Sequence, residues 1–153
     1  MKELLLTILN RFEPITLPEM DSVKLMTRND TKYTCHITDL PAILETAIAH
    51  YQILEIGGSR LMGYESQYYD TPEHEMYIRH HNKNRNRYKI RIRQYLNSGD
   101  YFLEVKFKKN TGTTEKKRIP LPGYDCQELP EFKEFIKTNS RFKFDMIEPK
   151  LFS

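Results

Sequence analysis

Basic and apolar residues alternate in the stretch RYKIRIR, residues 87–93. Alternate side chains of a strand lie on opposite faces of a sheet, so the basic residues of this stretch would share one face. They are Arg87, Lys89, Arg91 and Arg93. Arginine offers planar pairs of N–H donors to phosphate oxygens, and lysine offers a compact positive charge. The spacing therefore predicts a strand that binds an anion on one face.

Two later segments, FLEVKFK (102–108) and EKKRIPL (115–121), continue this pattern. If the three strands are antiparallel neighbours, eight basic residues and one acid share a surface, which we call the basic face. Its members are Arg87, Lys89, Arg91, Arg93, Lys106, Lys108, Lys116, Arg118 and the single acid Glu104. Ordinary solvated sheet faces also alternate, but like charges opposite one another destabilise a sheet. A bound anion would compensate this surplus, so we favour a functional interpretation.

The charge of the chain is segregated along its length. Residues 79–118 hold 13 of the 24 Lys and Arg residues and only three acids, which gives this window a net charge of +10 against −7 for the rest. Such segregation indicates a local positive field that attracts an anion. Composition by itself leaves three kinds of anion open: a nucleic acid, a phosphate compound or a membrane headgroup.

Composition excludes several classes of protein. The 153 residues are 39% hydrophobic, enough for one folded domain. No run approaches the roughly 18 apolar residues of a membrane span, so none is expected. Cys35 and Cys126 have no CxxC spacing, which favours a reducing compartment, and we expect a cytoplasmic protein. Neither GxxxxGK[ST] nor GxGxxG occurs, so nucleotide binding at a helix N-terminus is not indicated. The stretch HEMYI (74–78) lacks the second histidine of the HExxH pattern, which excludes a zinc protease of that type.

The pattern predicts an α+β fold in which antiparallel strands carry the basic face. Helices are expected over residues 3–12, 38–51, 71–81 and 130–138. Strands are expected over residues 22–36, 52–56, 60–70, 87–95, 101–108, 115–121 and 146–152. Gly57–Gly58 is predicted to join the strands 52–56 and 60–70 as a hairpin. Tyr64 and Tyr68 are interpreted as ordinary strand residues.

Several segments, in their order, resemble the VTC domain, the polyphosphate polymerase branch of the triphosphate tunnel metalloenzymes, also called the CYTH-like fold. These are LMTRNDTKY (25–33), YESQYYDT (64–71), MYIRHHNKNRNRYKIRIRQY (76–95), FLEVKFK (102–108) and EKKRIPL (115–121). The resemblance implies a closed antiparallel β-tunnel with helices packed outside. It also implies transfer of the γ-phosphoryl group of ATP onto polyphosphate, or use of another triphosphate, with a divalent metal, Mn²⁺ or Mg²⁺.

The resemblance assigns roles to individual residues. Those matching phosphate-binding positions are Lys32, Arg91, Arg93, Lys106 and Lys116, and of these Arg91, Arg93 and Lys106 are expected to be catalytic. By strand parity, Lys89 and Arg118 lie on the same inward side. Glu104 is expected either to bind the metal or to orient Lys106 or Arg93 through a salt bridge.

This sequence departs from the wider superfamily in two ways. The stretch MTRNDTKY (26–33) lacks the E-x-E-x-K signature, which argues against a simple triphosphatase or cyclase and favours the polymerase branch. The family also continues past EPKLFS (148–153) with further basic strands and a metal-binding glutamate. We therefore expect residues 1–153 to form one VTC-like domain, the N-terminal portion of an incomplete tunnel, that is inactive or weakly active. Its exposed strand edges would favour a homodimer.

Two other functions stay open on the sequence alone. The first is a non-catalytic module that binds polyphosphate or another polyanion. The second is a nucleic-acid-binding β domain that stacks bases on its tyrosines. No nucleic-acid partner is expected, because the central strands have Arg and Lys on the face where stacking rings would be needed.

Overall fold

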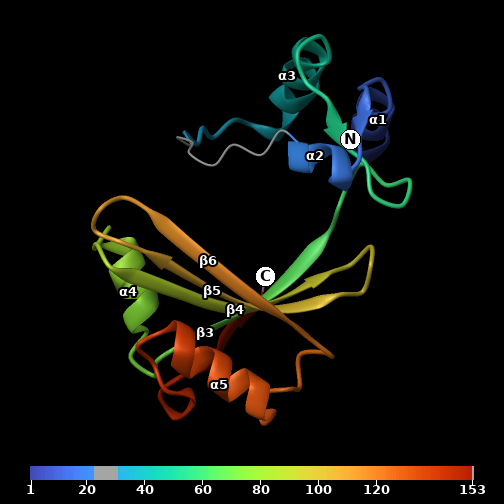
Figure 1. The fold of residues 1–153 in the computed structure, drawn as a ribbon. Coiled ribbons are helices and arrows are strands. Elements are labelled where there is room, and N and C mark those ends of the chain that lie inside the picture. The colour runs from blue at the N-terminus through green and yellow to red at the C-terminus, as the bar shows by residue number, and fades with distance from the viewer. Residues whose placement is uncertain (23–30, 153) are drawn as a thin grey trace. The chain divides into compact units, whose positions relative to one another are not determined.

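The structure is a computed structural model that describes residues 1–22 and 31–152. The chain forms two compact units, an N-terminal unit, Met1–Met62, and a C-terminal unit, Gly63–Ser153. Each unit is described by itself (Figure 1).

The N-terminal unit is built from short elements. They are α1 (Lys2–Leu9), β1 (Pro14–Ile15), α2 (Leu17–Ser22), the 3-10 helix η1 (Ile37–Asp39), α3 (Leu40–Ala47) and β2 (Ile53–Leu54). Ile8, Leu9 and Phe12 form its buried core, against which Leu44 and Ile53 pack. Arg60 links the end of this unit to its start, because its guanidinium donates to the carbonyl oxygens of Leu9 and Phe12, at 3.0 Å each.

Three predictions for this unit were wrong. Residues 31–36 form no strand, and residues 23–30 of the strand predicted over 22–36 lie outside the described residues. The predicted hairpin does not form, because Ile53–Leu54 pairs in parallel with Pro14–Ile15. The helix predicted over residues 3–12 ends at Leu9, and α2 was missed. Gly57–Gly58 does form a tight turn with positive φ, closed by an Ile56–Ser59 bridge.

The C-terminal unit is a five-stranded antiparallel sheet with helices. Its elements are β3 (Tyr64–Asp70), α4 (Glu75–His81), β4 (Arg87–Tyr95), β5 (Tyr101–Lys108), β6 (Thr114–Leu121), α5 (Pro130–Asn139), the 3-10 helix η2 (Phe144–Met146) and β7 (Glu148–Phe152). The strand order is β6-β5-β4-β3-β7. The predicted α+β antiparallel fold is confirmed. In the part of the chain that the structure describes, the sheet is open rather than a closed tunnel, as expected for an incomplete one.

One face of this sheet packs against α5 (Figure 1). Ile90, Ile92 and Leu103 are fully buried there, together with Phe132 and Ile136 from one side of α5. Burial of these side chains stabilises the unit by roughly 1.5–3 kcal/mol each. Because side chains alternate along the strands, the residues of the basic face lie on the opposite side of the sheet, as predicted, whereas Lys117 of β6 lies on the α5 side with Val105.

Asp70, at the end of β3, caps the start of α4. Its Oδ1 accepts hydrogen bonds from the backbone N–H groups of Thr71 and Met76, and its Oδ2 accepts one from Tyr77, each at 2.8 Å. The helix start predicted at Thr71 is therefore displaced to Glu75, whose N–H donates to Thr71 Oγ1 at 3.1 Å. We missed this role of Asp70 in the sequence.

Replacing this cap should loosen α4. We expect Asp70→Ala to lower the free energy of unfolding by about 2 kcal/mol, because three backbone donors lose their acceptor. Glu73→Ala, an exposed neighbour, should leave the unfolding free energy almost unchanged. Urea unfolding followed by circular dichroism measures both variants, and equal losses would contradict the capping role.

Candidate functional site

Next to the directly opposite pair Arg87 and Lys108, the strand register arranges the basic face in three further rows across the sheet. The first row is Lys89, Lys106 and Lys116; the second is Tyr68, Arg91, Glu104 and Arg118; the third is Ser66, Arg93 and Phe102. Directly opposite residues of an antiparallel pair have Cβ atoms about 4.5–5.5 Å apart. The sheet therefore brings together all the predicted site residues of β4, β5 and β6.

Glu104 is the buried acid of this face, with only 2% of its surface exposed. Its Oε2 accepts from Arg91, 2.7 Å from Nε and 2.6 Å from Nη2, and Lys116 Nζ lies 2.6 Å from Oε1. Burial acts to raise the pKa of Glu104, but the hydrogen bonds from Lys116 and Arg91 outweigh it and hold that pKa below its usual value. Glu104 is therefore an ionised anchor for Arg91 and Lys116, rather than for Lys106 or Arg93.

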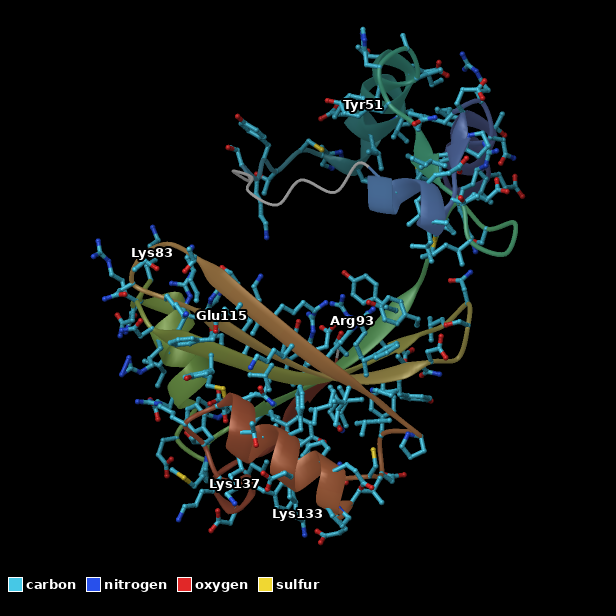
Figure 2. The ribbon with its side chains drawn as sticks, viewed as in Figure 1. Tyr51, Lys83, Arg93, Glu115, Lys133 and Lys137 are labelled. Atoms are coloured by element: carbon cyan, nitrogen blue, oxygen red, sulfur yellow. The ribbon has the colours of Figure 1, made fainter. Side chains whose placement is uncertain are left out.

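Side chains of β3 hold the two central arginines. The hydroxyl of Tyr68 accepts from Arg91 Nη1 at 3.1 Å, and the Arg91 guanidinium lies 5.8 Å from the centre of the Tyr68 ring. Arg93 donates through Nε to Ser66 Oγ at 3.2 Å, and its guanidinium lies 3.9 Å from the centre of the Tyr64 ring. Figure 2 shows Arg93 on the sheet face opposite α5. These contacts orient both guanidinium groups before any ligand binds.

The supporting residues of β3 were not recognised in the sequence as part of the site. The sequence predicts ordinary strand positions for Tyr64 and Tyr68, and its motifs give no role to Ser66. The alternation in YESQY places all three on one face, which is the signal that was available. Phe102 on β5 has the same role, since the Arg118 guanidinium lies 4.5 Å from the centre of its ring.

The remaining predicted residues differ in their surroundings. Lys106 and Arg118 are exposed on the basic face, and Lys89 is half-buried. Lys32 belongs to the N-terminal unit, where it is exposed in the irregular segment before η1. Its participation in the site stays a prediction.

The divalent metal implied by the resemblance does not fit the donors of this face. Among residues 1–22 and 31–152, no three His, Cys, Asp or Glu side chains cluster as a metal site would require. Both carboxylate oxygens of Glu104 already contact cations. Hard metal ions need several free oxygen ligands, which Glu104 by itself does not supply. The metal-ligand role of Glu104 therefore stays a prediction that the geometry does not favour.

The lowered pKa of Glu104 makes a prediction for acid stability. A carboxylate whose pKa is lower in the folded state than its ordinary value of 4.5 stabilises the fold above that value. The stabilisation is lost as the pH falls through the folded-state pKa. We expect the difference in unfolding free energy between the wild type and Glu104→Gln to be constant near neutral pH and to shrink below about pH 4.5. Urea unfolding at several pH values measures it, and a difference that grows on acidification would contradict the ion pairs.

The fold and the site together define an α+β domain with one helix-covered apolar face and one cationic sheet face. The family model of the VTC domain matches residues 27–148. This range covers most of the chain, so the protein belongs to the VTC domain family. The family is associated with polyphosphate polymerase function. A search among curated proteins found no match.

No helix within the described residues is both long and apolar enough to cross a bilayer.

Proposed function

We propose that the basic face binds the phosphates of ATP and of a polyphosphate chain, as part of a phosphotransferase that moves the ATP γ-phosphoryl group onto polyphosphate. One observation supports this above all: eight basic side chains share a face with a single acid, and that acid is itself paired with Arg91 and Lys116. The other cations of this face compensate the charge of a bound polyanion.

The reaction requires positioning and neutralisation of charge. A terminal oxygen of polyphosphate attacks the γ-phosphorus, and the bond from that phosphorus to the oxygen bridging it to the β-phosphate breaks, so ADP leaves. Arg91 and Arg93, held by Glu104, Tyr68 and Ser66, donate to the phosphate oxygens on which negative charge develops. Lys106 adds a third positive charge. Pre-oriented donors of this kind supply much of the catalysis of phosphoryl transfer.

The metal, the location and the assembly state stay predictions within this proposal. Mn²⁺ or Mg²⁺ is expected from the family, and we assign none of the described residues to it. A cytoplasmic location would give access to ATP. A homodimer would use an edge of the sheet such as β6, which static light scattering measures directly.

A non-catalytic polyphosphate-binding module is the second candidate. It is favoured by the environment of Glu104, whose two oxygens contact Arg91 and Lys116 and so are engaged by cations. Nucleic-acid binding has less support, because the rings of Tyr64 and Phe102 lie under the guanidinium groups of Arg93 and Arg118. A guanidinium group over one face of a ring leaves at most the other face open for a base to stack on it.

Two assays on the whole chain separate these functions. Calorimetric titration with tripolyphosphate should show binding for both the enzyme and the module, and a single-stranded oligonucleotide of equal charge should bind more weakly. Prolonged incubation with ATP and Mn²⁺ or Mg²⁺, followed by sensitive detection of polyphosphate, should show a small amount of product for the enzyme and none for the module. Absence of tripolyphosphate binding would overturn both candidates.

A further inference from the structure

A cavity of about 810 Å³ lies in the C-terminal unit, where α4 meets β3 and β4. Apolar and aromatic side chains form much of its wall, among them Tyr69, Met76, Tyr77, Ile78 and Ile90. Cavities of this size and lining are typical of small-molecule sites in proteins. None of the roles given above to the basic face accounts for this cavity.

The cavity and the basic face share two residues. Lys89 lines the cavity and stands directly opposite Lys106 in the first row of the basic face. Tyr68 also lines the cavity, while its hydroxyl accepts a hydrogen bond from Arg91. A ligand in the cavity therefore has its nearest anion-binding groups at Lys89, with Arg91 and Lys106 following across the sheet.

Tyr77 gives the cavity a flat apolar surface. Its side chain belongs to the wall, yet 65% of the residue is exposed. The ring stacks on His81, with the ring centres 6.1 Å apart and the planes at 20°. An aromatic ring held in this way, with its surface open, is suited to stack on a flat heterocycle.

Two acids line the cavity, Asp70 and Glu73, and they differ in how strongly they repel an anionic ligand. The carboxylate of Asp70 accepts hydrogen bonds from the backbone of α4, including those of Met76 and Tyr77, which disperse its charge. Glu73 is exposed and lines the cavity too, where its carboxylate is suited to accept from a sugar hydroxyl. Lys150 adds a second cation, paired with Glu148.

We propose that this cavity binds the base and ribose of a nucleoside triphosphate, whose triphosphate extends past Lys89 toward Arg91 and Lys106. The base stacks on Tyr77 and contacts Met76. This inference rests on the proposed function, since it requires the basic face to bind the triphosphate. It adds that the protein recognises the nucleoside as well as the phosphates, and that residues of α4 make this contact.

Calorimetric titration of the whole chain with ATP and with tripolyphosphate tests the cavity. The wild type should bind ATP more tightly than tripolyphosphate. Tyr77→Ala, a change at an exposed position, should weaken ATP binding about tenfold, in the range found for loss of one stacking ring. The same variant should change tripolyphosphate binding less than about twofold, since that ligand has no base. Tyr77→Phe keeps the ring and should retain the affinity for ATP.

The outcomes separate this inference from the proposed function. Equal wild-type affinities for the two ligands, or an equal loss of both in Tyr77→Ala, would overturn the cavity and leave the proposed function standing. Binding of ATP that depends on Tyr77, with no binding of tripolyphosphate, would support recognition of the nucleoside by the cavity but overturn the proposed function, and with it the path of the triphosphate toward Arg91 and Lys106. Absence of binding by either ligand would overturn both.

Discussion

Replacing Arg91 and Arg93 together with alanine should weaken the binding of tripolyphosphate by at least about 100-fold. Each guanidinium is expected to make charge-assisted hydrogen bonds to phosphate oxygens, worth roughly 1.5–3 kcal/mol apiece. Both are already oriented, Arg91 by Glu104 and Arg93 by Ser66, so little ordering is required on binding. Calorimetric titration at 0.15 M salt measures the loss, with circular dichroism to show that the variant is folded.

Two further variants sharpen this test. Lys133→Ala with Lys137→Ala also removes two cations, but from α5, the helix that covers the opposite face (Figure 2). Screening at this salt concentration acts over about 8 Å, so affinity should change less than about twofold. Arg91→Lys with Arg93→Lys keeps the charge and removes the planar pair of donors, and we expect a loss of about tenfold. Equal losses in the alanine double variant and the α5 double variant would contradict a specific site.

Glu104→Gln should lower the free energy of unfolding by about 2 kcal/mol. The glutamine side chain has one oxygen for Arg91 and turns an N–H₂ group toward Lys116, so the charge of both cations is left uncompensated. Removing one partner of a fully buried ion pair costs roughly 3–5 kcal/mol. Our value is lower because the side chains of Arg91 and Lys116 are 20% and 44% exposed.

The matched control lies on the neighbouring strand. Glu115 pairs with Lys109, and their side chains are 52% and 39% exposed, against 2% for Glu104. Glu115→Gln makes the same chemical change at a more solvated pair. The urea midpoint of unfolding of this variant should therefore equal that of the wild type. Tripolyphosphate should raise the stability of Glu104→Gln, because a ligand of the folded state adds to it. Equal midpoints for the two glutamine variants would show that Glu104 is not an anchor.

The central strands were predictable because their information is local. Alternation set the faces of β4 and β5, and turn residues such as Gly99, with φ of 76°, set where they end. Both strands have the predicted bounds, residues 87–95 and 101–108. Pairing of β1 with β2 joins residues far apart in the sequence, and no local pattern indicates it.

The site was predictable in its charges but not in its contacts. Strand parity alone placed Arg91 and Arg93 on one face with Glu104. The partners of Glu104 depend on register, since Arg91 is directly opposite and Lys116 is reached diagonally. The tyrosines of β3 became part of the site only once β3 paired with β4.

The most direct test of the central claim follows the arginine side chains themselves. Tripolyphosphate should be added to the protein labelled with ¹⁵N while the Nε–Hε resonances of the arginines are recorded by NMR. We predict that the signals of Arg91 and Arg93 shift first and saturate together, while that of Arg141, at Phe142 and Glu75, stays in place. Shifts confined to other arginines, with Arg91 and Arg93 unchanged at saturation, would contradict the account.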